Sequence, residues 1–334
     1  MALSRIAARI AGTGSHVPER RLTNFELEKM VETSDAWIKD RTGISARRIA
    51  APEVGTTDLA GAAARRALES AEMSAGEIDG IIVATVTSER IMPSAACVLQ
   101  SSLGCRPILA FDVSAACSGF LYALSVADSF IQTGRMRTCL VVGAECLSRI
   151  VDYRDRETCV LFGDGAGAVV LERAAEGEPG RFLSFHLSAN GGQADQLTLK
   201  SVAGGGGPFA DPLVTSVGKP FVEMRGREIF KSAVTAMRDR CREALVENGL
   251  TVEQIDWFIP HQANRRIIDA VGSQLGFAPE RVIVNLETLG NTSSASIPIA
   301  FDEAARSGRI RRGQKVMMAA FGGGLTSASA MLEY

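Results

Sequence analysis

Three absences narrow the classes of protein to which this sequence can belong. No apolar run approaches the roughly 18–20 residues that a bilayer-spanning helix needs, so the sequence predicts no membrane span. Arg5 and Arg9 interrupt the apolar residues near the N-terminus, where a signal peptide would have an unbroken hydrophobic stretch. The formal net charge is only −2, which gives no global reason to expect a nucleic-acid partner.

The cysteines also lack a pattern. Seven are present, with no Cys-x-x-Cys pair, and only three histidines accompany them. This spacing does not indicate a disulfide framework or a structural zinc site, so we expect no bound metal. Free cysteines in apolar stretches behave as small buried hydrophobic residues and persist in a reducing cytosol. The sequence therefore predicts a cytoplasmic protein.

An internal repeat, offset by about 175 residues, is the clearest pattern that is present. An apolar-periodic helix is predicted at 58–79 and again at 230–256, each followed by a short buried strand. A strand, a turn and a helix are predicted at 108–130 and again at 282–304. Such alternation is typical of parallel sheets covered by helices, so we expect an α/β protein.

We expect two duplicated halves, residues 1–173 and 174–334, to pack against each other. The first strand is predicted at Arg5 to Ala11, ending at a Gly-Thr-Gly turn. The glycine-rich segment 201–220 lacks the Lys-Ser/Thr of a phosphate-binding loop. A flexible surface or lid loop is the better interpretation of that segment.

Cys117 is the best candidate for a nucleophile. It follows the strand-like segment 108–113 and precedes an apolar helix, which places its sulfur at a helix N-terminus. The helix dipole favours the thiolate there, so we expect the thiol pKa to fall below its usual value of about 8.5. A cysteine taken at random is more often a buried structural residue. The small neighbours in Ser-Ala-Ala-Cys-Ser-Gly leave room for a substrate and favour the nucleophile.

Two polar residues and a glycine loop lie, like Cys117, at turns or at the ends of predicted strands. His261 follows the strand-like segment 255–260, and ligands of α/β sheets gather at such strand ends. Asn291 lies in the turn that corresponds to the Cys117 turn, although local sequence alone favours a helix N-cap. Glycines 322–324 follow a buried strand, where exposed N–H groups can bind an oxyanion. A structural role is the ordinary alternative for a lone histidine such as His261.

Taken in order, these motifs resemble the β-ketoacyl-acyl-carrier-protein synthase III family over nearly the whole chain. The shared segments are TSDAWIKDRTGI (33–44), PSAAC (93–97), SAACSG (114–119), FGDGAGAVVL (162–171), IFKSAV (229–234), PHQAN (260–264), GNTSSAS (290–296) and FGGG (321–324). The resemblance implies the thiolase-like fold, a duplicated five-layer α/β/α/β/α arrangement, and a homodimer.

The resemblance also implies the initiating condensation of type II fatty acid synthesis. The Cys117 thiolate would take an acyl group from acyl-coenzyme A, with the N–H groups of Cys117 and Gly323 as the oxyanion hole. Malonyl-acyl-carrier protein would then enter. His261 and Asn291 would hydrogen-bond its thioester carbonyl as carbon dioxide leaves and the new carbanion attacks the acyl group. No cofactor is implied beyond these two substrates.

The resemblance also implies residues that bind coenzyme A, the carrier protein and the acyl chain, by their positions in the shared segments. The coenzyme A contacts implied are Thr33, Trp37, Arg41, Arg156 and Asn264, with Trp37 and Arg156 on opposite faces of the adenine. The carrier-docking residues implied are Lys231, Arg265 and Arg266. Phe162 would line the acyl tunnel, and Met92 would reach into the acyl pocket of the partner subunit.

The chain departs from the family pattern at two places. Ser273 and Gln274 replace a basic pair of some members, so part of the docking patch is missing and Arg265 is the residue able to compensate. Met92 stands where members often have Phe. Because methionine adapts to irregular cavities, the length and branching of the primer stay open.

Three other functions share this fold. A degradative thiolase needs a second catalytic cysteine near the C-terminus, and no cysteine follows Cys241. An acyltransferase that uses an oxygen or nitrogen acceptor would load Cys117 without decarboxylation, and it is the main alternative. A non-catalytic acyl-binding protein would be expected to lack one of the three catalytic residues. The presence of both His261 and Asn291 favours condensation.

Overall fold

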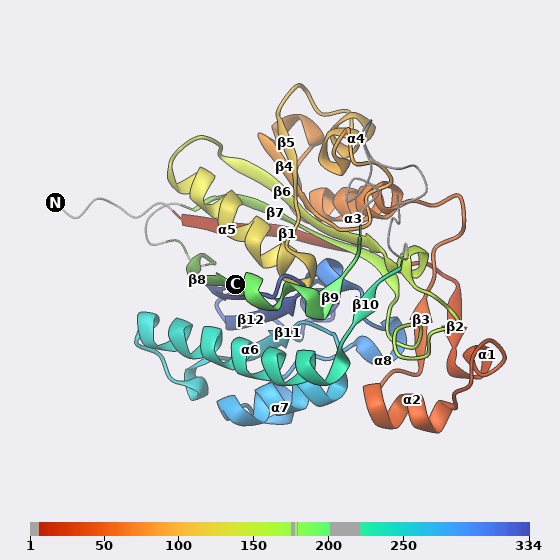
Figure 1. Cartoon of the computed structure of the whole chain (residues 1–334). Coiled ribbons are helices and arrows are strands. Elements are labelled where there is room, and N and C mark those ends of the chain that lie inside the picture. The colour runs from red at the N-terminus through yellow and green to blue at the C-terminus, as the bar shows by residue number, and fades with distance from the viewer. Residues whose placement is uncertain (1–6, 175–177, 179, 201–220) are drawn as a thin grey trace.

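Two β-sheets form the framework of the computed structural model, which describes residues 7–174, 178, 180–200 and 221–334 (Figure 1). The first sheet has the order β1 (Ala7–His16), β7 (Asp164–Ala174), β6 (Thr138–Cys146), β4 (Gly80–Ala84) and β5 (Leu109–Val113). The second has the order β8 (Phe182–Ala189), β13 (Thr326–Glu333), β12 (Lys315–Gly322) and β11 (Trp257–Pro260).

The second sheet repeats the first strand by strand. The pairs β1–β7 and β8–β13 are antiparallel, as are β6–β7 and β12–β13. The pairs β4–β6 and β11–β12 are both parallel. Val282 forms a parallel bridge with Phe258 of β11, at the place that β5 occupies beside β4. The exact division at residues 173 and 174 stays a prediction.

Helices complete a five-layer arrangement, which confirms the predicted fold class. The pair α3 and α4 covers the outer face of the first sheet, α5 and α9 lie between the sheets, and α6 packs on the outer face of the second sheet with α7 beside it (Figure 1). Their bounds are α3 (Thr56–Ser70), α4 (Ala95–Ser102), α5 (Gly119–Gln132), α6 (Gly226–Asn248), α7 (Arg265–Leu275) and α9 (Ser296–Arg306). None of the described helices has the length and apolar character needed to cross a membrane.

A separate hydrophobic core fills each space between layers. One core, with Phe120 and Phe301, lies between the sheets around α5 and α9. A second, with Phe258 and Ile268, lies under α6 and α7, and a third, with Leu59 and Leu99, lies under α3 and α4. Burial of such side chains contributes about 1.5–3 kcal/mol each, so the two sheets are held rigidly against the central helices.

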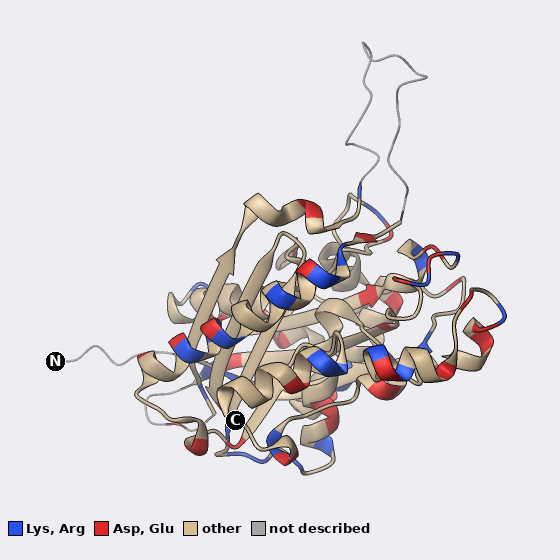
Figure 2. Cartoon of the chain, turned by 60° about the horizontal axis from the view of Figure 1, so that its bottom comes forward, with Lys and Arg blue, Asp and Glu red and all other residues tan. Residues whose placement is uncertain are grey.

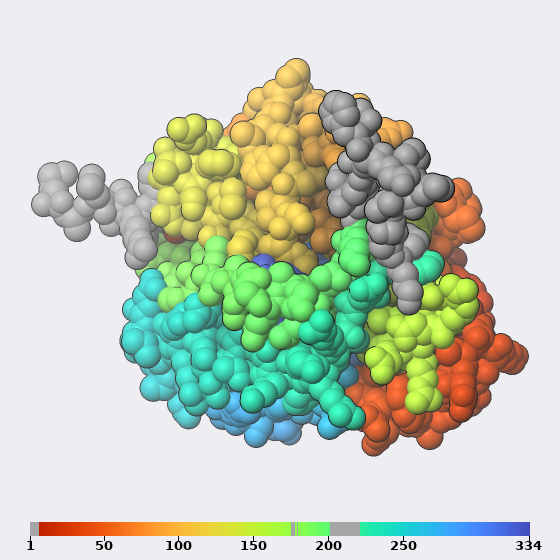
Figure 3. Space-filling view, in the orientation of Figure 1, coloured from red at the N-terminus to blue at the C-terminus, as the bar shows by residue number. Residues whose placement is uncertain are grey.

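Shorter elements form a lobe beside the second sheet and link the layers. The lobe contains β2 (Arg21–Thr23), β3 (Ala46–Arg48), α1 (Asn24–Leu27), α2 (Asp35–Thr42) and α8 (Leu286–Leu289). The strands β9 (Leu197–Thr198) and β10 (Glu223–Met224) pair with each other nearer the middle of the molecule (Figure 1). In the space-filling view, the green residues that include β8 and β9 form a band between the yellow and orange first half and the cyan second half (Figure 3). The predicted lid loop at 201–220 and the start of the first strand at Arg5 lie outside the described residues.

The predicted turn at residues 12–14 is wrong, because β1 continues through them to His16. Close packing explains the glycines instead. A Cβ on Gly12 would meet the backbone of Ala67 in α3 and of Ala71 at its C-terminal cap, and a Cβ on Gly14 would meet the backbone of the same helix. The glycines at 165 and 167 likewise lie inside β7, where a Cβ on Gly167 would approach Ile299 N of α9 to 2.6 Å.

The substitution Gly12→Ala is expected to lower the free energy of unfolding by about 1–3 kcal/mol, because the added methyl overpacks the contact between β1 and α3. A denaturant titration followed by circular dichroism measures the change. Gly191→Ala is the matched control, since a Cβ there meets nothing within 4 Å. Equal destabilisation by the two substitutions would contradict this explanation of the glycines in β1.

Candidate active site

The turn formed by residues 291–296 brings the three predicted catalytic residues together. Asn291 belongs to the turn itself. The Ser293 side chain hydrogen-bonds the thiol of Cys117, which comes from the first half of the chain. The Ser296 Oγ lies 2.6 Å from Nδ1 of His261, at the end of β11. One short segment therefore contacts all three residues.

Cys117 lies in the 3₁₀ turn η2 (Ala116–Ser118), directly before α5. This is the predicted position at a helix start, but the predicted fall in the thiol pKa is wrong. Burial of the sulfur between the two halves raises the pKa of Cys117 to about 11, a hydrogen bond from Ser293 opposes the rise, and the charge of Glu145 adds to it. Desolvation of a thiolate outweighs the helix dipole here, so the free protein holds a thiol at neutral pH.

His261 is buried, and its backbone N–H donates to Ala319 of β12 over 2.7 Å. Burial lowers the pKa of His261 to about 3, so the imidazole is neutral at physiological pH. The Gln262 N–H donates to Ser296 Oγ over 3.3 Å, which leaves the Ser296 hydroxyl hydrogen free to donate to Nδ1 of His261. We assign the hydrogen of the imidazole to Nε2 on this ground, which makes Nε2 a hydrogen-bond donor.

Asn291 is buried and held at three points. Its N–H donates to Leu161 O over 2.9 Å, and its carbonyl accepts from Gly163 N over 2.9 Å. Its side-chain Oδ1 accepts from Ser293 N over 2.8 Å, which leaves Nδ2 to donate elsewhere. The expectation from local sequence of a helix cap is wrong for α9, because Ala295 precedes that helix.

The glycine loop after β12 lies against the Cys117 turn. A Cβ on Gly322 would come within 2.6 Å of Cys117 N, so only glycine allows this approach. A Cβ on Gly323 would lie 3.7 Å from that of Ala116. This arrangement places the backbone of both predicted oxyanion donors, Cys117 and Gly323, side by side, while their role stays a prediction.

The residues predicted to bind coenzyme A gather where α2, α7 and the loop before β7 meet. The guanidinium carbon of Arg156 lies 5.1 Å from the centre of a Trp37 ring, and that of Arg41 lies 5.7 Å from it. Asn264 donates through Nδ2 to Arg41 O over 2.9 Å and caps α7. The Thr33 hydroxyl is buried without a hydrogen-bond partner, so it is able to accept or donate to a ligand.

The predicted acyl-pocket and docking residues lie in different surroundings. Phe162 is buried and forms a bridge with Asn291, whereas Met92 is 82 % exposed. The predicted docking residues Lys231, Arg265 and Arg266 are exposed on α6 and α7. Figure 2 shows positions of basic and acidic residues interspersed along the helices that face the viewer.

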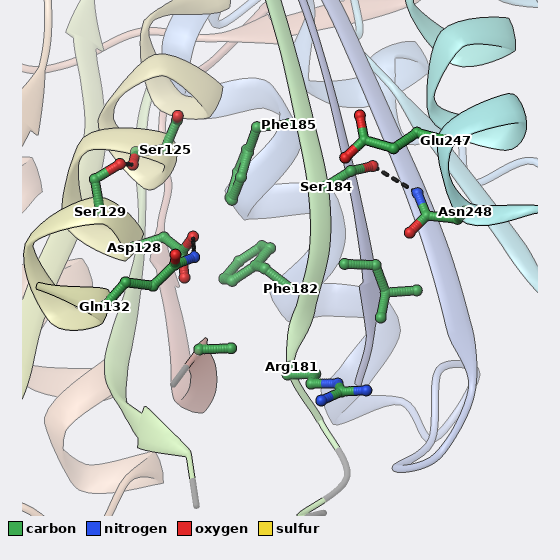
Figure 4. Close-up of a pocket in the computed structure, with 12 residues that line it drawn as sticks. Ser125, Asp128, Ser129, Gln132, Arg181, Phe182, Ser184, Phe185, Glu247 and Asn248 are labelled. Carbon is green, nitrogen blue, oxygen red and sulfur yellow. Dashed lines mark hydrogen bonds between the residues drawn. The ribbon is translucent and has the colours of Figure 1, made fainter. Parts of the chain in front are cut away.

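A hollow of about 350 Å³ lies apart from these residues (Figure 4). Side chains of α5, β8 and the end of α6 line it, among them Asp128, Phe185 and Asn248. None of the predicted site residues contributes to it. The candidate site is therefore identified by its polar contacts and not by cavity size.

Sequence reasoning missed Ser293, Ser296 and Glu145. The two serines lie within the motif GNTSSAS, where the density of hydroxyls close to Asn291 was the available signal. Glu145 lies near the end of β6, fully buried, and its Oε1 lies 3.1 Å from the hydroxyl of Ser294 in the same turn. No local pattern distinguishes Glu145 from an exposed glutamate in the sequence.

Comparisons with known proteins show the family to which this chain is similar. The family model of 3-oxoacyl-[acyl-carrier-protein] synthase III matches residues 111–191, and the model of its C-terminal part matches residues 245–334. Proteins named β-ketoacyl-[acyl-carrier-protein] synthase III are similar over 98 % of this chain and 99 % of their own length. They include those of Thioalkalivibrio sulfidiphilus, at 53 % identity, and Alkalilimnicola ehrlichii, at 51 %.

Solved structures are similar as well. The 3-oxoacyl-[acyl-carrier-protein] synthase III of Aquifex aeolicus superposes with a TM-score of 0.90 at 46 % identity, over 98 % of this chain and 100 % of its own. The priming β-ketosynthase of the R1128 polyketide pathway gives 0.90 at 37 % identity, over 99 % and 97 %. Xanthomonas campestris OleA, at 22 % identity and a TM-score of 0.86 over 98 % and 99 %, shares the fold.

The imidazole of His261 is expected to stay neutral, with its hydrogen on Nε2, from about pH 5 to 8. The reason is that burial holds its pKa near 3 and Ser296 donates to Nδ1. Nitrogen-15 NMR of histidine-labelled protein measures both properties, and His261→Asn assigns the signal.

Ser296→Ala should shift the tautomer population towards hydrogen on Nδ1, whereas Ser307→Ala, at the other end of α9, should leave it unchanged. A His261 signal that titrates near 6.5 would show that burial does not set the charge of this residue.

Proposed function

The chain belongs to the β-ketoacyl-[acyl-carrier-protein] synthase III family, and we propose that Cys117, His261 and Asn291 carry its reaction. It is an acyltransferase that condenses an acyl-coenzyme A primer with malonyl-acyl-carrier protein, releasing coenzyme A and carbon dioxide and initiating fatty acid synthesis. The observation that carries the residue assignment is the turn 291–296, which contacts the thiol, the imidazole and the amide at once.

In the first half-reaction, the sulfur of Cys117 attacks the thioester carbonyl of the primer and loses its proton. The bond from that carbonyl to the coenzyme A sulfur breaks, and the leaving thiolate is protonated. The N–H groups of Cys117 and Gly323 would stabilise the oxyanion of the tetrahedral intermediate. Because burial keeps the resting cysteine as a thiol, we propose that the thiolate forms only as the thioester enters.

In the second half-reaction, Nε2 of His261 and Nδ2 of Asn291 donate to the thioester carbonyl of the malonyl group. As the carboxylate leaves as carbon dioxide, negative charge develops on that carbonyl oxygen. Two neutral, fixed donors stabilise the charge without transferring a proton. The carbanion then attacks the acyl carbon on Cys117, whose sulfur leaves as a thiolate. Donor positions fixed by Ser296 and Ser293 support this assignment.

Coenzyme A would enter between α2 and α7. We propose that its adenine stacks on Trp37, on the ring face that Arg156 now covers, so that the guanidinium moves outward to lie over the base. Arg41, Asn264 and the unpartnered hydroxyl of Thr33 would bind polar groups of the ligand. No cofactor takes part in the proposed reaction.

The carrier protein would dock over α6 and α7 through Lys231, Arg265 and Arg266. Arg266 lies over the Phe230 ring, with its guanidinium carbon 5.8 Å from the ring centre, and so keeps its charge exposed at the surface. Arg265 forms an ion pair with Asp269 over 2.8 Å, which reduces its ability to replace the basic pair missing at Ser273 and Gln274. We therefore expect Lys231 and Arg266 to contribute most to docking.

We also propose that the protein is a cytoplasmic homodimer that pairs through β5. This strand lies at the edge of the first sheet, and an unpaired edge is a template for another strand. Leu109 on β5 is 43 % exposed, and Ile91 and Met92 are 78 % and 82 % exposed. Pairing of two copies would cover Leu109 and bring Met92 towards the acyl pocket of the partner.

Incubation with a panel of acyl-coenzyme A primers should give an acyl adduct on the intact protein, and Cys117→Ser should abolish that adduct. Addition of malonyl-acyl-carrier protein should then release β-ketoacyl-carrier protein. Intact mass measures the adduct and the product. Loading without a malonyl-dependent product would refute condensation and support acyl transfer to an oxygen or nitrogen acceptor.

Leu109→Asp is expected to convert the dimer to a monomer, because it places a charge on the edge that would pair. Light scattering during size-exclusion chromatography measures the mass. Val246→Asp is the control, since Val246 is 82 % exposed on α6, away from that edge. A wild-type monomer, or a dimer that survives Leu109→Asp, would contradict pairing through β5.

A further inference from the structure

Glu145 is a fully buried carboxyl group that the proposed reaction does not use. It ends β6 and faces the loop after β4. Its Oε2 accepts from the hydroxyls of Thr85 and Thr87, over 3.2 and 2.5 Å, and from Val86 N over 3.1 Å. Its Oε1 lies 3.1 Å from the hydroxyl of Ser294. The side chain thus connects the first half to the turn 291–296.

The hydroxyl of Ser294 shows which form of Glu145 fits this network. Ser294 Oγ lies 2.8 Å from Ala84 O and 3.1 Å from Glu145 Oε1, and it has a single hydrogen for two acceptors. A carbonyl oxygen cannot donate, so the Ser294 hydrogen goes to Ala84. A proton on Oε1 then completes the network by donating to Ser294 Oγ. The ionised carboxylate would leave two acceptors competing for one hydrogen.

We propose that Glu145 is a positioning residue whose protonated form fixes the turn beside Cys117, and whose ionisation suppresses the reactivity of the Cys117 thiol. This inference rests on the proposed function, because it assumes that Cys117 is the nucleophile. Burial raises the pKa of Glu145 to about 7, although hydrogen bonds that include those from Thr87, Val86 and Thr85 oppose the rise. The charged form in turn raises the pKa of Cys117.

Two other ionisable groups, Cys146 and Asp164, lie near Glu145 along the sheet. In the register of β6 with β7, Glu145 lies opposite Gly165, and the next residue, Cys146, lies opposite Asp164. Burial raises the pKa of Asp164, whose carboxylate accepts from Ser148 and from Ala50 N, and raises that of Cys146 to about 12. The groups that face Glu145 from the loop after β4 and from Ser294 are hydroxyl and N–H groups, which do not ionise in this pH range. Cys117 is the described group whose ionisation Glu145 is found to oppose.

The experiment compares wild type with Glu145→Gln by the rate at which iodoacetamide alkylates Cys117 across pH. Glutamine has the shape and the donor of the protonated acid, but it cannot ionise. The ratio of the variant rate to the wild-type rate should be about one below pH 6 and rise to about tenfold above pH 8, because a pKa difference of one unit changes the thiolate fraction tenfold. Peptide mass spectrometry resolves Cys117 from the exposed Cys97, which serves as an internal reference.

Two further measurements make the result decisive. Glu145→Asp keeps an ionisable carboxyl and should keep the pH dependence of wild type, even if its rates are lower throughout. Wild type alone should show a shoulder near pH 7 in the logarithm of the rate, so the test does not depend on folding of a variant. The proposal would be overturned if the ratio of the Glu145→Gln rate to the wild-type rate were constant with pH. It would also be overturned if the logarithm of the wild-type rate rose with unit slope through pH 7. Because alkylation needs no malonyl substrate, its outcome is independent of the test for condensation.

Discussion

The hydrogen bonds made by the turn 291–296 are the constraint on which the site depends. Ser293 contacts the Cys117 thiol, Ser294 contacts Glu145, and Ser296 contacts His261, while Asn291 is held by the backbone of the loop before β7. The turn belongs to the second half, whereas Cys117, Glu145 and the loop before β7 belong to the first. Displacement of one half relative to the other would therefore separate the nucleophile from the decarboxylation donors.

Duplication supplies the geometry for this meeting. The turns η2 (Ala116–Ser118) and η8 (Ser293–Ala295) each precede a central helix, and each begins with a residue of positive φ, 46° at Ala116 and 48° at Ser293. Left-handed backbone costs roughly 1–2 kcal/mol in a residue other than glycine, and such residues cluster at functional sites. Here both strained residues flank the same sulfur. A second consequence is that burial raises the pKa of the Cys117 thiol and lowers that of the His261 imidazole, so both are neutral.

Periodicity and the repeat predicted the layers of the fold because a duplicated pattern of strand and helix admits few arrangements. They also placed Cys117, His261 and Asn291 at turns and strand ends. The prediction for residues 12–14 failed because a glycine required by helix packing has the same local sequence as a glycine required by a turn. The thiol pKa was predicted in the wrong direction because desolvation depends on what the other half buries. Glu145 was missed for the same reason, since its partners are distant in sequence.

The central claim is that one site carries out two separable half-reactions, with Cys117 for loading and His261 and Asn291 for decarboxylation. The most direct test measures both in a single variant, His261→Ala, with isotopically labelled malonyl-acyl-carrier protein. The account predicts that the acyl adduct on Cys117 forms at close to the wild-type extent, while release of labelled carbon dioxide falls by about 10²–10³. Equal loss of both half-reactions, or undiminished carbon dioxide release, would contradict it.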